Sequence, residues 1–244
     1  MDQVGLCPSL ESLCSVEATH HLIVTHKVTN DGNDRSQLSP MSNKTKAALE
    51  VEKLDVVADR GYFDSKEILA CDEAGITVTL PKPLTSGNKA KGRYGKQDFR
   101  YVADEDVYVC PAAKRLVFHY ANEERGLILR RYWTNACGAC AIRDKCTTGK
   151  ERRITRWEHE HVLEAVQRRL DENPDKMRQR RETVEHPFGT IKSWMGATHF
   201  LMKRLKNVRT EMALHVLAYN LKRVMTIIGI RPLMAAIRAQ AMPA

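Results

Sequence analysis

Residues 54–81 read LDVVADRGYFDSKEILACDEAGITVTLP, and this stretch gives the clearest prediction of the fold class. Its first six residues, 54–59, are mostly apolar and predict a short buried strand. Asp64 favours the start of a helix that ends at Gly75, and the β-branched residues 76–81 predict a second strand. A strand, a helix and a strand within about 30 residues form a βαβ unit. The sequence therefore predicts an α/β domain with parallel strands.

Asp59 ends the first of these strands and is followed by the turn Arg60-Gly61-Tyr62. In open α/β sheets, ligands bind outside the carboxyl ends of the strands, so this position favours a functional carboxylate. The other interpretation is an aspartate that caps a turn, which is the commoner role for such a residue. This feature alone leaves both interpretations open.

The segments around this unit extend the α/β pattern. Residues 20–29 predict a strand, and residues 36–50 predict a helix. The Lys- and Gly-rich residues 82–98 predict a loop, and residues 99–120 predict the strands of a hairpin. A last long helix is expected over residues 208–228.

The composition is that of a globular protein. The chain has 244 residues, of which 43% are apolar and 28% charged, and no apolar run is long enough to span a bilayer. The N-terminus lacks the basic start and apolar core of a signal peptide. Seven cysteines, unevenly spread, argue against a secreted disulfide framework. We therefore expect a cytoplasmic protein without a membrane partner, built from one large or two small domains.

The positive charge is concentrated in the second half of the chain. The net charge is +9, and residues 114–231 hold 25 Lys and Arg against 13 Asp and Glu. The remaining segments hold 14 against 17. This asymmetry favours a polyanionic partner, most often nucleic acid. A solvated basic surface is an equally good interpretation of the charge alone.

A second charged pattern lies in RRETVEHPFGTIK, residues 180–192. Offsets of four and seven put Arg181, Glu185 and Lys192 on one face of a continuous helix. Exposed charge pairs four residues apart would explain the first two alone. A proline and a glycine interrupt the segment, however, and a plain surface helix would avoid both. We therefore expect these interruptions of the helix to have a reason.

Together the two patterns resemble the signatures of DDE-type insertion-sequence transposases. Residues 59–62 match the Asp-x-Gly-Tyr motif of that family. Arg181, Glu185 and Lys192 match its Arg-x3-Glu-x6-Lys signature. The surrounding residues are similar to the branch that carries a cysteine-rich insertion between its second and third acidic residues. The resemblance covers about residues 16–230, and the paired motifs are more specific than either alone.

The resemblance implies a ribonuclease-H-like fold, a mixed sheet flanked by helices, here with a small cysteine-rich β insertion. Three carboxylates of this family hold two Mg²⁺ ions, which serve DNA cleavage and strand transfer. By the resemblance, Asp59 is the second carboxylate and Glu185 the third. Arg181 and Lys192 lie near DNA phosphates, and Tyr62 packs or contacts DNA near the site. The implied partner is double-stranded DNA, both element ends and target, bound by a homodimer.

The sequence departs from the family pattern at two places. Arg178 stands where the fuller signature has a tyrosine, which affects contacts with DNA ends. The first acidic residue belongs to an earlier strand, which residues 1–13 do not resemble. Of the earlier aspartates Asp2, Asp31 and Asp34, the first lies at the terminus and the second fits a turn. We therefore expect a chain truncated at its N-terminal end, without its first strand, and with weak or no turnover.

The chain is thus predicted to have four segments, and three functions are open to it. The segments are the N-terminal part of the ribonuclease-H-like core (1–100), the cysteine-rich insertion (101–155), the C-terminal helical part of the core (156–230) and a tail (231–244). The favoured function is DNA cleavage and strand transfer of an insertion sequence. The alternatives are a DNA-binding transposase remnant without catalysis and a metal-dependent nuclease on the same fold.

A group of cysteines lies within the predicted insertion. Cys137, Cys140 and Cys146 are close in sequence, and Cys110 precedes them across a predicted hairpin. Four thiolates favour a tetrahedral structural Zn²⁺ site, which would organise a loop too poor in apolar residues to build a core. An iron–sulfur cluster and a set of reduced, partly buried cysteines are the other interpretations.

Two further side chains have simple structural interpretations. Trp194, two residues after Lys192, is expected to pack in the core, with contact to a flipped base as the alternative. Asn220 breaks the apolar stripe of the last long helix, which a buried hydrogen bond would explain.

Overall fold

The computed structural model describes residues 2–9, 12–83 and 87–241. It divides into two compact units, the first made of residues 1–82 and 162–244 and the second of residues 83–161. Within the described residues there are two five-stranded sheets and six α-helices, which confirms the predicted α/β class and is consistent with a ribonuclease-H-like fold. None of the described helices combines the length and the apolar character needed to cross a membrane.

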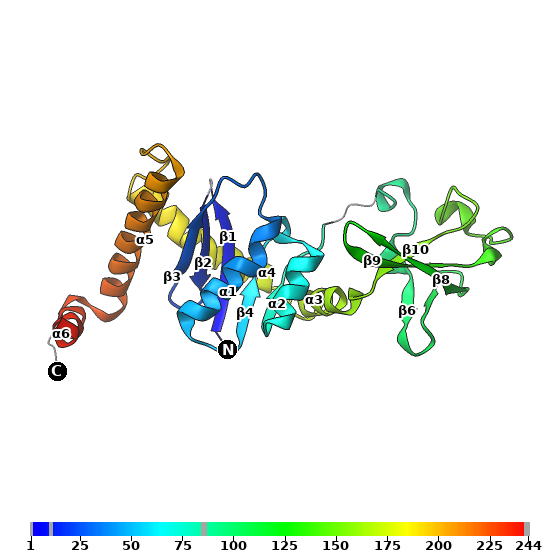
Figure 1. Ribbon diagram of the computed structural model, residues 1–244, viewed down its shortest axis with the longest axis horizontal. Coiled ribbons are helices and arrows are strands. Elements are labelled where there is room, and N and C mark those ends of the chain that lie inside the picture. The colour runs from blue at the N-terminus through cyan, green and yellow to red at the C-terminus, as the bar shows by residue number, and fades with distance from the viewer. Residues whose placement is uncertain (1, 10–11, 84–86, 242–244) are drawn as a thin grey trace. The chain divides into compact units, whose positions relative to one another are not determined.

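The first unit contains one sheet and most of the helices (Figure 1). Its strands are β1 (Asp2–Ser9), β2 (Ser12–Glu17), β3 (Ile23–Val28), β4 (Leu54–Val57) and β5 (Ile76–Thr79). Its helices are α1 (Leu38–Leu49), α2 (Ser65–Glu73), α4 (Lys176–Gly189), α5 (Leu205–Ile228) and α6 (Ile230–Ala241). A further helix, α3 (Glu160–Glu172), begins in the last residues of the second unit and continues in the first. The helix α6 spans most of the predicted tail, residues 231–244.

The order of the strands in this sheet is β3-β2-β1-β4-β5. The strand β4 is parallel to both of its neighbours, β1 and β5, whereas β2 is antiparallel to β1 and to β3. Four strands, β3, β1, β4 and β5, therefore run in one direction. Their carboxyl ends lie at the same edge of the sheet, where ligands bind in open α/β sheets.

The central strand β1 lies at residues 2–9, for which the sequence predicted no strand. Residues 1–13 carry no alternating pattern, and Gly5 and Pro8 disfavour a strand by propensity. The structure nevertheless places β1 between β2 and β4, with Val4 and Leu6 fully buried. A central strand covered on both faces needs no alternation, which is why the pattern in the sequence was not informative.

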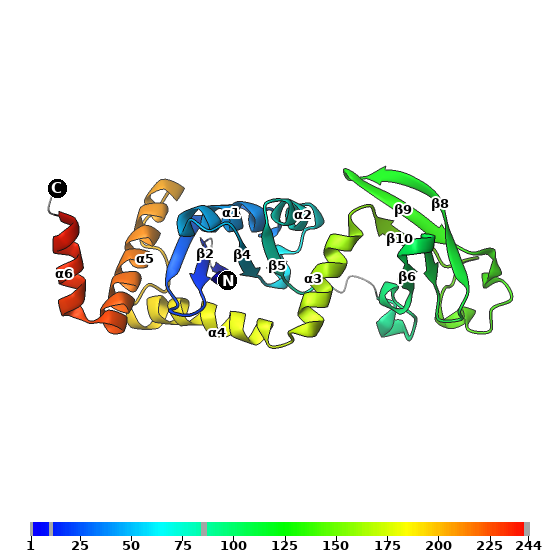
Figure 2. The same cartoon turned by 90° about the horizontal axis from the view of Figure 1, so that it is seen from below.

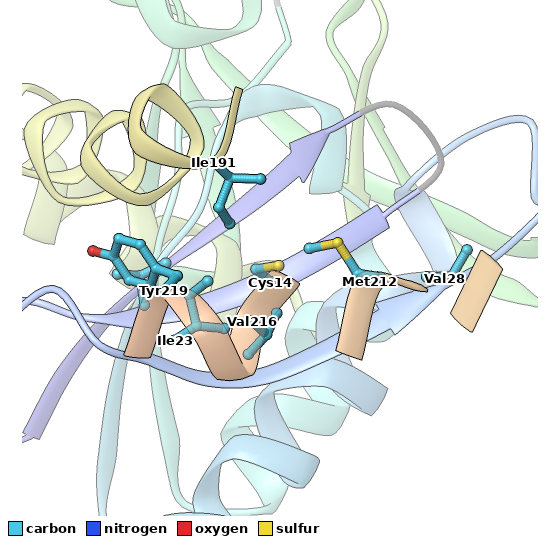
Figure 3. Close-up of a cluster of buried hydrophobic side chains, with 8 residues drawn as sticks. Cys14, Ile23, Val28, Ile191, Met212, Val216 and Tyr219 are labelled. Carbon is cyan, nitrogen blue, oxygen red and sulfur yellow. The ribbon is translucent and has the colours of Figure 1, made fainter. Parts of the chain in front are cut away.

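Helices cover both faces of the sheet, as expected for the fold. One face is covered by α1, against β2 and β3, and by α2, against β5. The other face is covered by α4, which crosses β1, β2 and β4 (Figure 2). The helix α5 lies along the edge strand β3. Figure 3 shows the cluster between this helix and the sheet: Cys14, Val16, Ile23, Val28, Ile191, Met212, Val216 and Tyr219.

The second unit is an antiparallel meander in the order β10-β9-β8-β7-β6. Its strands are β6 (Arg100–Val102), β7 (Val107–Val109), β8 (Arg115–Glu124), β9 (Leu127–Trp133) and β10 (Ile154–Trp157). The unit begins before and ends after the predicted insertion, 101–155. It begins earlier because Tyr94 and Phe99 pack into its core with Tyr108, Leu116 and Tyr132.

Candidate functional site

Asp59 lies two residues after β4, at the edge where β1, β3 and β4 end. Its Oδ1 atom accepts a hydrogen bond of 2.7 Å from the backbone N–H of Gly61, which fixes the turn that follows. A Cβ atom at position 61 would lie 3.0 Å from that oxygen, so the turn favours glycine. The capping interpretation of Asp59 is therefore correct, and it leaves Oδ2 available for a second contact.

Asp34 brings a second carboxylate to this edge. It follows β3, and the short helical turns at Arg35–Gln37 and Arg60–Tyr62 contact each other. A Cβ atom built on Gly61 would lie 3.8 Å from Asp34 Oδ2 and 3.0 Å from Asp59 Oδ1, so both carboxylates border this position. Burial, and then the negative charge of Asp59, raise the pKa of Asp34 above its ordinary value. No local pattern in the sequence distinguishes Asp34, because its proximity to Asp59 depends on β3 and β4 running in parallel.

Arg180 is the cationic partner of Asp59. Its Nη2 atom lies 3.2 Å from Asp59 Oδ2, and its Nε and Nη2 atoms donate hydrogen bonds of 3.1 and 2.7 Å to the carbonyl oxygen of Leu6. One guanidinium thus joins α4 to the ends of β1 and β4. The sequence motif points to Arg178 and Arg181 instead, and only the rotation of α4 about its axis distinguishes Arg180 from them.

The remaining predicted charges lie on the outer face of α4 and beyond its end. Arg178, Arg181 and Glu185 are exposed, whereas Thr183 and Val184 are buried. Glu185 follows Arg180 by five residues, which places it roughly 140° around the helix. The helical phase thus brings Arg180, not Glu185, to Asp59. Within the described part of the chain, no three His, Cys, Asp or Glu side chains form a group that could hold a metal ion.

The proline and the glycine do not break the helix. The helix α4 continues through Pro187 and Gly189 into a π-helical turn at Thr190–Trp194, which contains Lys192. A proline has no N–H to donate to the carbonyl four residues earlier, which here belongs to Thr183. The Nδ1 atom of His21 lies 3.4 Å from that carbonyl oxygen. His21 therefore replaces the missing helical donor, and the extra residue in the π turn shifts Lys192 out of register with Glu185.

Two aromatic predictions have opposite outcomes. The side chain of Tyr62 is fully buried, so it packs beneath the site and cannot touch DNA in this conformation. Trp194 is 81% exposed, so the prediction that it packs in the core is wrong. The Nζ atom of Lys222 lies 5.2 Å from its ring centroid, and both residues border a cavity of about 180 Å³ together with Arg223.

The four predicted zinc ligands gather in the second unit. Cys110 lies after β7, and the other three belong to the loop between β9 and β10. All four line one cavity of about 20 Å³. Burial raises the pKa of Cys146, and the thiols of Cys137, Cys110 and Cys140 add to this, whereas Arg152 acts against it.

The second half of the chain is similar to a known protein family. Residues 109–225 match the family model described as transposase DDE domain. No significant match is found among curated proteins or among solved structures. The matched range contains Glu185, Arg181 and the four cysteines and begins after Asp59. The match over residues 109–225, just under half of the chain, therefore supports a DDE-type transposase.

Proposed function

We propose that the chain cleaves and joins DNA at the sheet edge where β3 and β4 end. The observation that carries this proposal is the pair of carboxylates, Asp59 and Asp34, beside the end of the central strand. Such an edge is where ligands bind in α/β sheets, and the family to which the matched domain belongs acts on DNA with divalent metal ions.

Asp34 and Asp59 are the residues that would hold a divalent ion. Burial, and then the negative charge of Asp59, already raise the pKa of Asp34, and a cation between the two carboxylates would relieve their repulsion. Mg²⁺ fits oxygen ligands of this kind and keeps several waters in its shell. When bound, such an ion activates a nucleophile and stabilises the leaving oxygen of a phosphodiester.

The chain's own residues constrain this chemistry. Arg180 neutralises part of the charge on Asp59, so a cation has to compete with its guanidinium. Glu185 is assigned as a further carboxylate by the resemblance, although it lies on the exposed face of α4. For both reasons we expect weak turnover, with Mg²⁺ affinity lower than a complete triad of carboxylates would give.

DNA binding is assigned to the cations of α4 and of the π turn. Arg178 and Arg181 lie on the outer part of α4 with Glu185 and are proposed to contact phosphates, as is Lys192. Trp194 offers an exposed ring beside Lys222, which supports stacking on a base. A DNA-binding role without catalysis is the second candidate, because Arg180 already neutralises Asp59 and no three-ligand group is assembled among the described residues.

The test is an assay on DNA that carries candidate element ends, in Mg²⁺ and in Mn²⁺. We expect slow nicking that disappears in Asp59→Asn and in Asp34→Asn. Glu73→Gln removes an exposed carboxylate at the end of α2 and should leave the rate unchanged. Joined products distinguish strand transfer from simple nuclease action. DNA binding without any metal-dependent nicking would replace the first candidate by the second.

A further inference from the structure

The second unit contains a small cavity lined by cysteine side chains. It is lined by Cys110, Cys137, Cys140 and Cys146, which come from two separate segments of the chain. Its volume of about 20 Å³ is close to the space of one water-sized sphere. Thiols from two separate segments of the chain thus line one small cavity.

The turn at Cys110 directs a backbone N–H at the sulfur atom. The N–H of Cys110 donates to the carbonyl oxygen of Lys114 over 2.9 Å, and the N–H of Ala113 donates to that of Cys110 over 2.8 Å. The N–H of Lys114 then lies 3.4 Å from Cys110 Sγ. A hydrogen bond of this kind to a ligand atom helps to orient that atom toward a metal ion.

The other residues around the cavity favour a soft metal ion. They include the apolar side chains of Phe99, Leu116 and Ile142 and the cationic side chains of Lys114, Arg143 and Arg152. No carboxylate and no imidazole is among the described residues of its lining. Sulfur is therefore the available ligand atom, which selects zinc over magnesium or calcium. The three cations would offset the negative charge of an ion bound by four thiolates.

The loop that carries three of the cysteines has little else to hold it. Between β9 and β10 it contains only the short helical turns Asn135–Cys137 and Arg143–Lys145. One cluster of five buried side chains forms much of the core of the described unit, and Cys110 and Cys146 pack against it. A small scaffold with so few buried side chains usually needs a metal or disulfides to fold stably.

We propose that Cys110, Cys137, Cys140 and Cys146 bind one Zn²⁺ ion as a structural site of the second unit. Each thiol that binds releases its proton to solvent, and no electron is transferred. Among the described residues, the four sulfur atoms are not close enough together to hold a metal ion as they stand. Rotation about the Cα–Cβ bond of each cysteine carries its sulfur between staggered positions, and the shared cavity lies within their reach.

The first measurement is the metal content of the full chain purified without chelator. We expect one zinc per chain, and we expect it to be lost in Cys137→Ser and in Cys110→Ser. Cys71→Ala is the matched control, because Cys71 is buried in α2 of the other unit and should leave the zinc in place. A chelator should lower the melting temperature of the unsubstituted chain and should not affect that of Cys137→Ser.

Replacement of zinc by Co²⁺ keeps the proposal testable if a variant fails to fold. Tetrahedral sulfur ligation would give intense visible bands and a sulfur-to-metal charge-transfer band in the unsubstituted chain. Chelator-insensitive stability, with four freely reactive thiols and no zinc or cobalt bound, would overturn the proposal. A chromophore that contains iron and acid-labile sulfide would also overturn it, in favour of a cluster.

Discussion

At the scale of single residues, the charge at the candidate site is set by three side chains. They are the carboxylates of Asp59 and Asp34 and the guanidinium of Arg180. Asp59 accepts hydrogen bonds from the N–H of Gly61 and from Arg180. Asp34 is repelled by the charge of Asp59, and among the described contacts it has no ion pair like the one between Asp59 and Arg180. This repulsion adds to the effect of burial on the pKa of Asp34. Asp34 is therefore the residue whose substitution best reports on the charge at this edge.

Asp34→Asn should stabilise the metal-free chain at pH 7, by less than about 1 kcal/mol. A carboxyl whose folded pKa lies above its unfolded pKa binds a proton more tightly when folded, so its ionisation destabilises the fold as pH rises through that range. In the unsubstituted chain, ionisation of Asp34 should lower the free energy of unfolding between pH 4 and pH 7. The variant should lack this contribution. Urea unfolding at several pH values tests this, and a variant less stable at pH 7 would contradict it.

Gly5→Ala should destabilise the first unit by about 1–3 kcal/mol, because a Cβ there would lie 2.9 Å from Val184 Cγ2. The double variant with Val184→Ala should be less destabilised than the sum of the two single variants, since the clash is removed. Gly32→Ala is the control, with no atom within 4 Å of its Cβ position. Additive effects in thermal unfolding would show that β1 and α4 are not packed as described.

At the scale of elements, the helix α5 packs along the edge strand β3 and covers it. Asn220 donates through Nδ2 to the carbonyl oxygen of Ile23 and accepts through Oδ1 from its N–H, over 2.8 and 3.0 Å. Arg209 and Arg223 reach the carbonyl oxygens of Val28 and His20. The buried hydrogen bond expected for Asn220 is thus confirmed. An exposed edge would otherwise invite pairing with another chain.

Asn220→Ala should lower the free energy of unfolding by about 1–3 kcal/mol, because both backbone groups of Ile23 lose their partner. Hydrogen exchange at Ile23 should become faster in the same variant. Asn207→Ala, at an exposed position near the start of α5, should change stability by less than about 0.5 kcal/mol. Equal protection of Ile23 in both variants would rule out this role of Asn220.

In the second unit, Asp106 lies in the turn between β6 and β7 and contacts side chains of β6 and β9. It accepts hydrogen bonds of 2.7 Å from the hydroxyls of Tyr101 and Tyr132 and pairs with Arg130. Burial raises the pKa of Asp106, but the hydrogen bonds from both tyrosines and the charge of Arg130 outweigh this and leave the pKa below its ordinary value. The turn between β6 and β7 is thus tied to β9 by a single carboxylate.

Asp106→Ala should destabilise this unit by about 1–3 kcal/mol, because the buried hydroxyl of Tyr132 loses its acceptor. The lowered pKa means that this stabilisation is complete above the unfolded pKa, near 4, and is lost as pH falls through the lower folded value. Hydrogen exchange of β7 and β9 between pH 2 and pH 6 measures this. Asp104→Ala, exposed in the same turn, should leave exchange unchanged.

At the scale of the whole molecule, the net charge is carried mainly by the second unit. Residues 83–161 hold 16 Lys and Arg against 10 Asp and Glu, and the rest of the chain holds 23 against 20. The basic stretch at 87–96 belongs to this unit rather than to the sheet that carries Asp59. We therefore expect the second unit to contribute strongly to the affinity for DNA, independently of the sheet edge that carries Asp59 and Asp34.

Neutralising Lys89 and Lys91 together should weaken DNA binding and reduce the slope of log affinity against log salt. Each phosphate that is no longer neutralised by a lysine reduces that slope by about 0.9. Lys53→Gln, an exposed lysine of the first unit before β4, serves as the control. An unchanged slope in the double variant would assign the binding of phosphates to other cations.

Prediction from sequence succeeded where the signal was local. The βαβ unit at 54–81, the turn at Asp59 and the bond at Asn220 depend on neighbours along the chain or on a simple polar requirement. It failed at β1, where a doubly covered strand carries no alternation, and at Trp194, whose exposure is decided by the turn after α4. The family of the matched domain was predicted from paired motifs, and the roles of Glu185 and Lys192 remain proposals.

The α/β class, the transposase signatures and the four cysteines could be read from the order of the residues, because these are properties of residue type and spacing. Which side chains meet became clear only in three dimensions. Parallel β3 and β4 bring Asp34 to Asp59, the phase of α4 selects Arg180 over Arg181, and the meander gathers the thiols around one cavity. The physical reason is that strand direction and helix rotation are set by packing across the sheet, which local spacing does not encode.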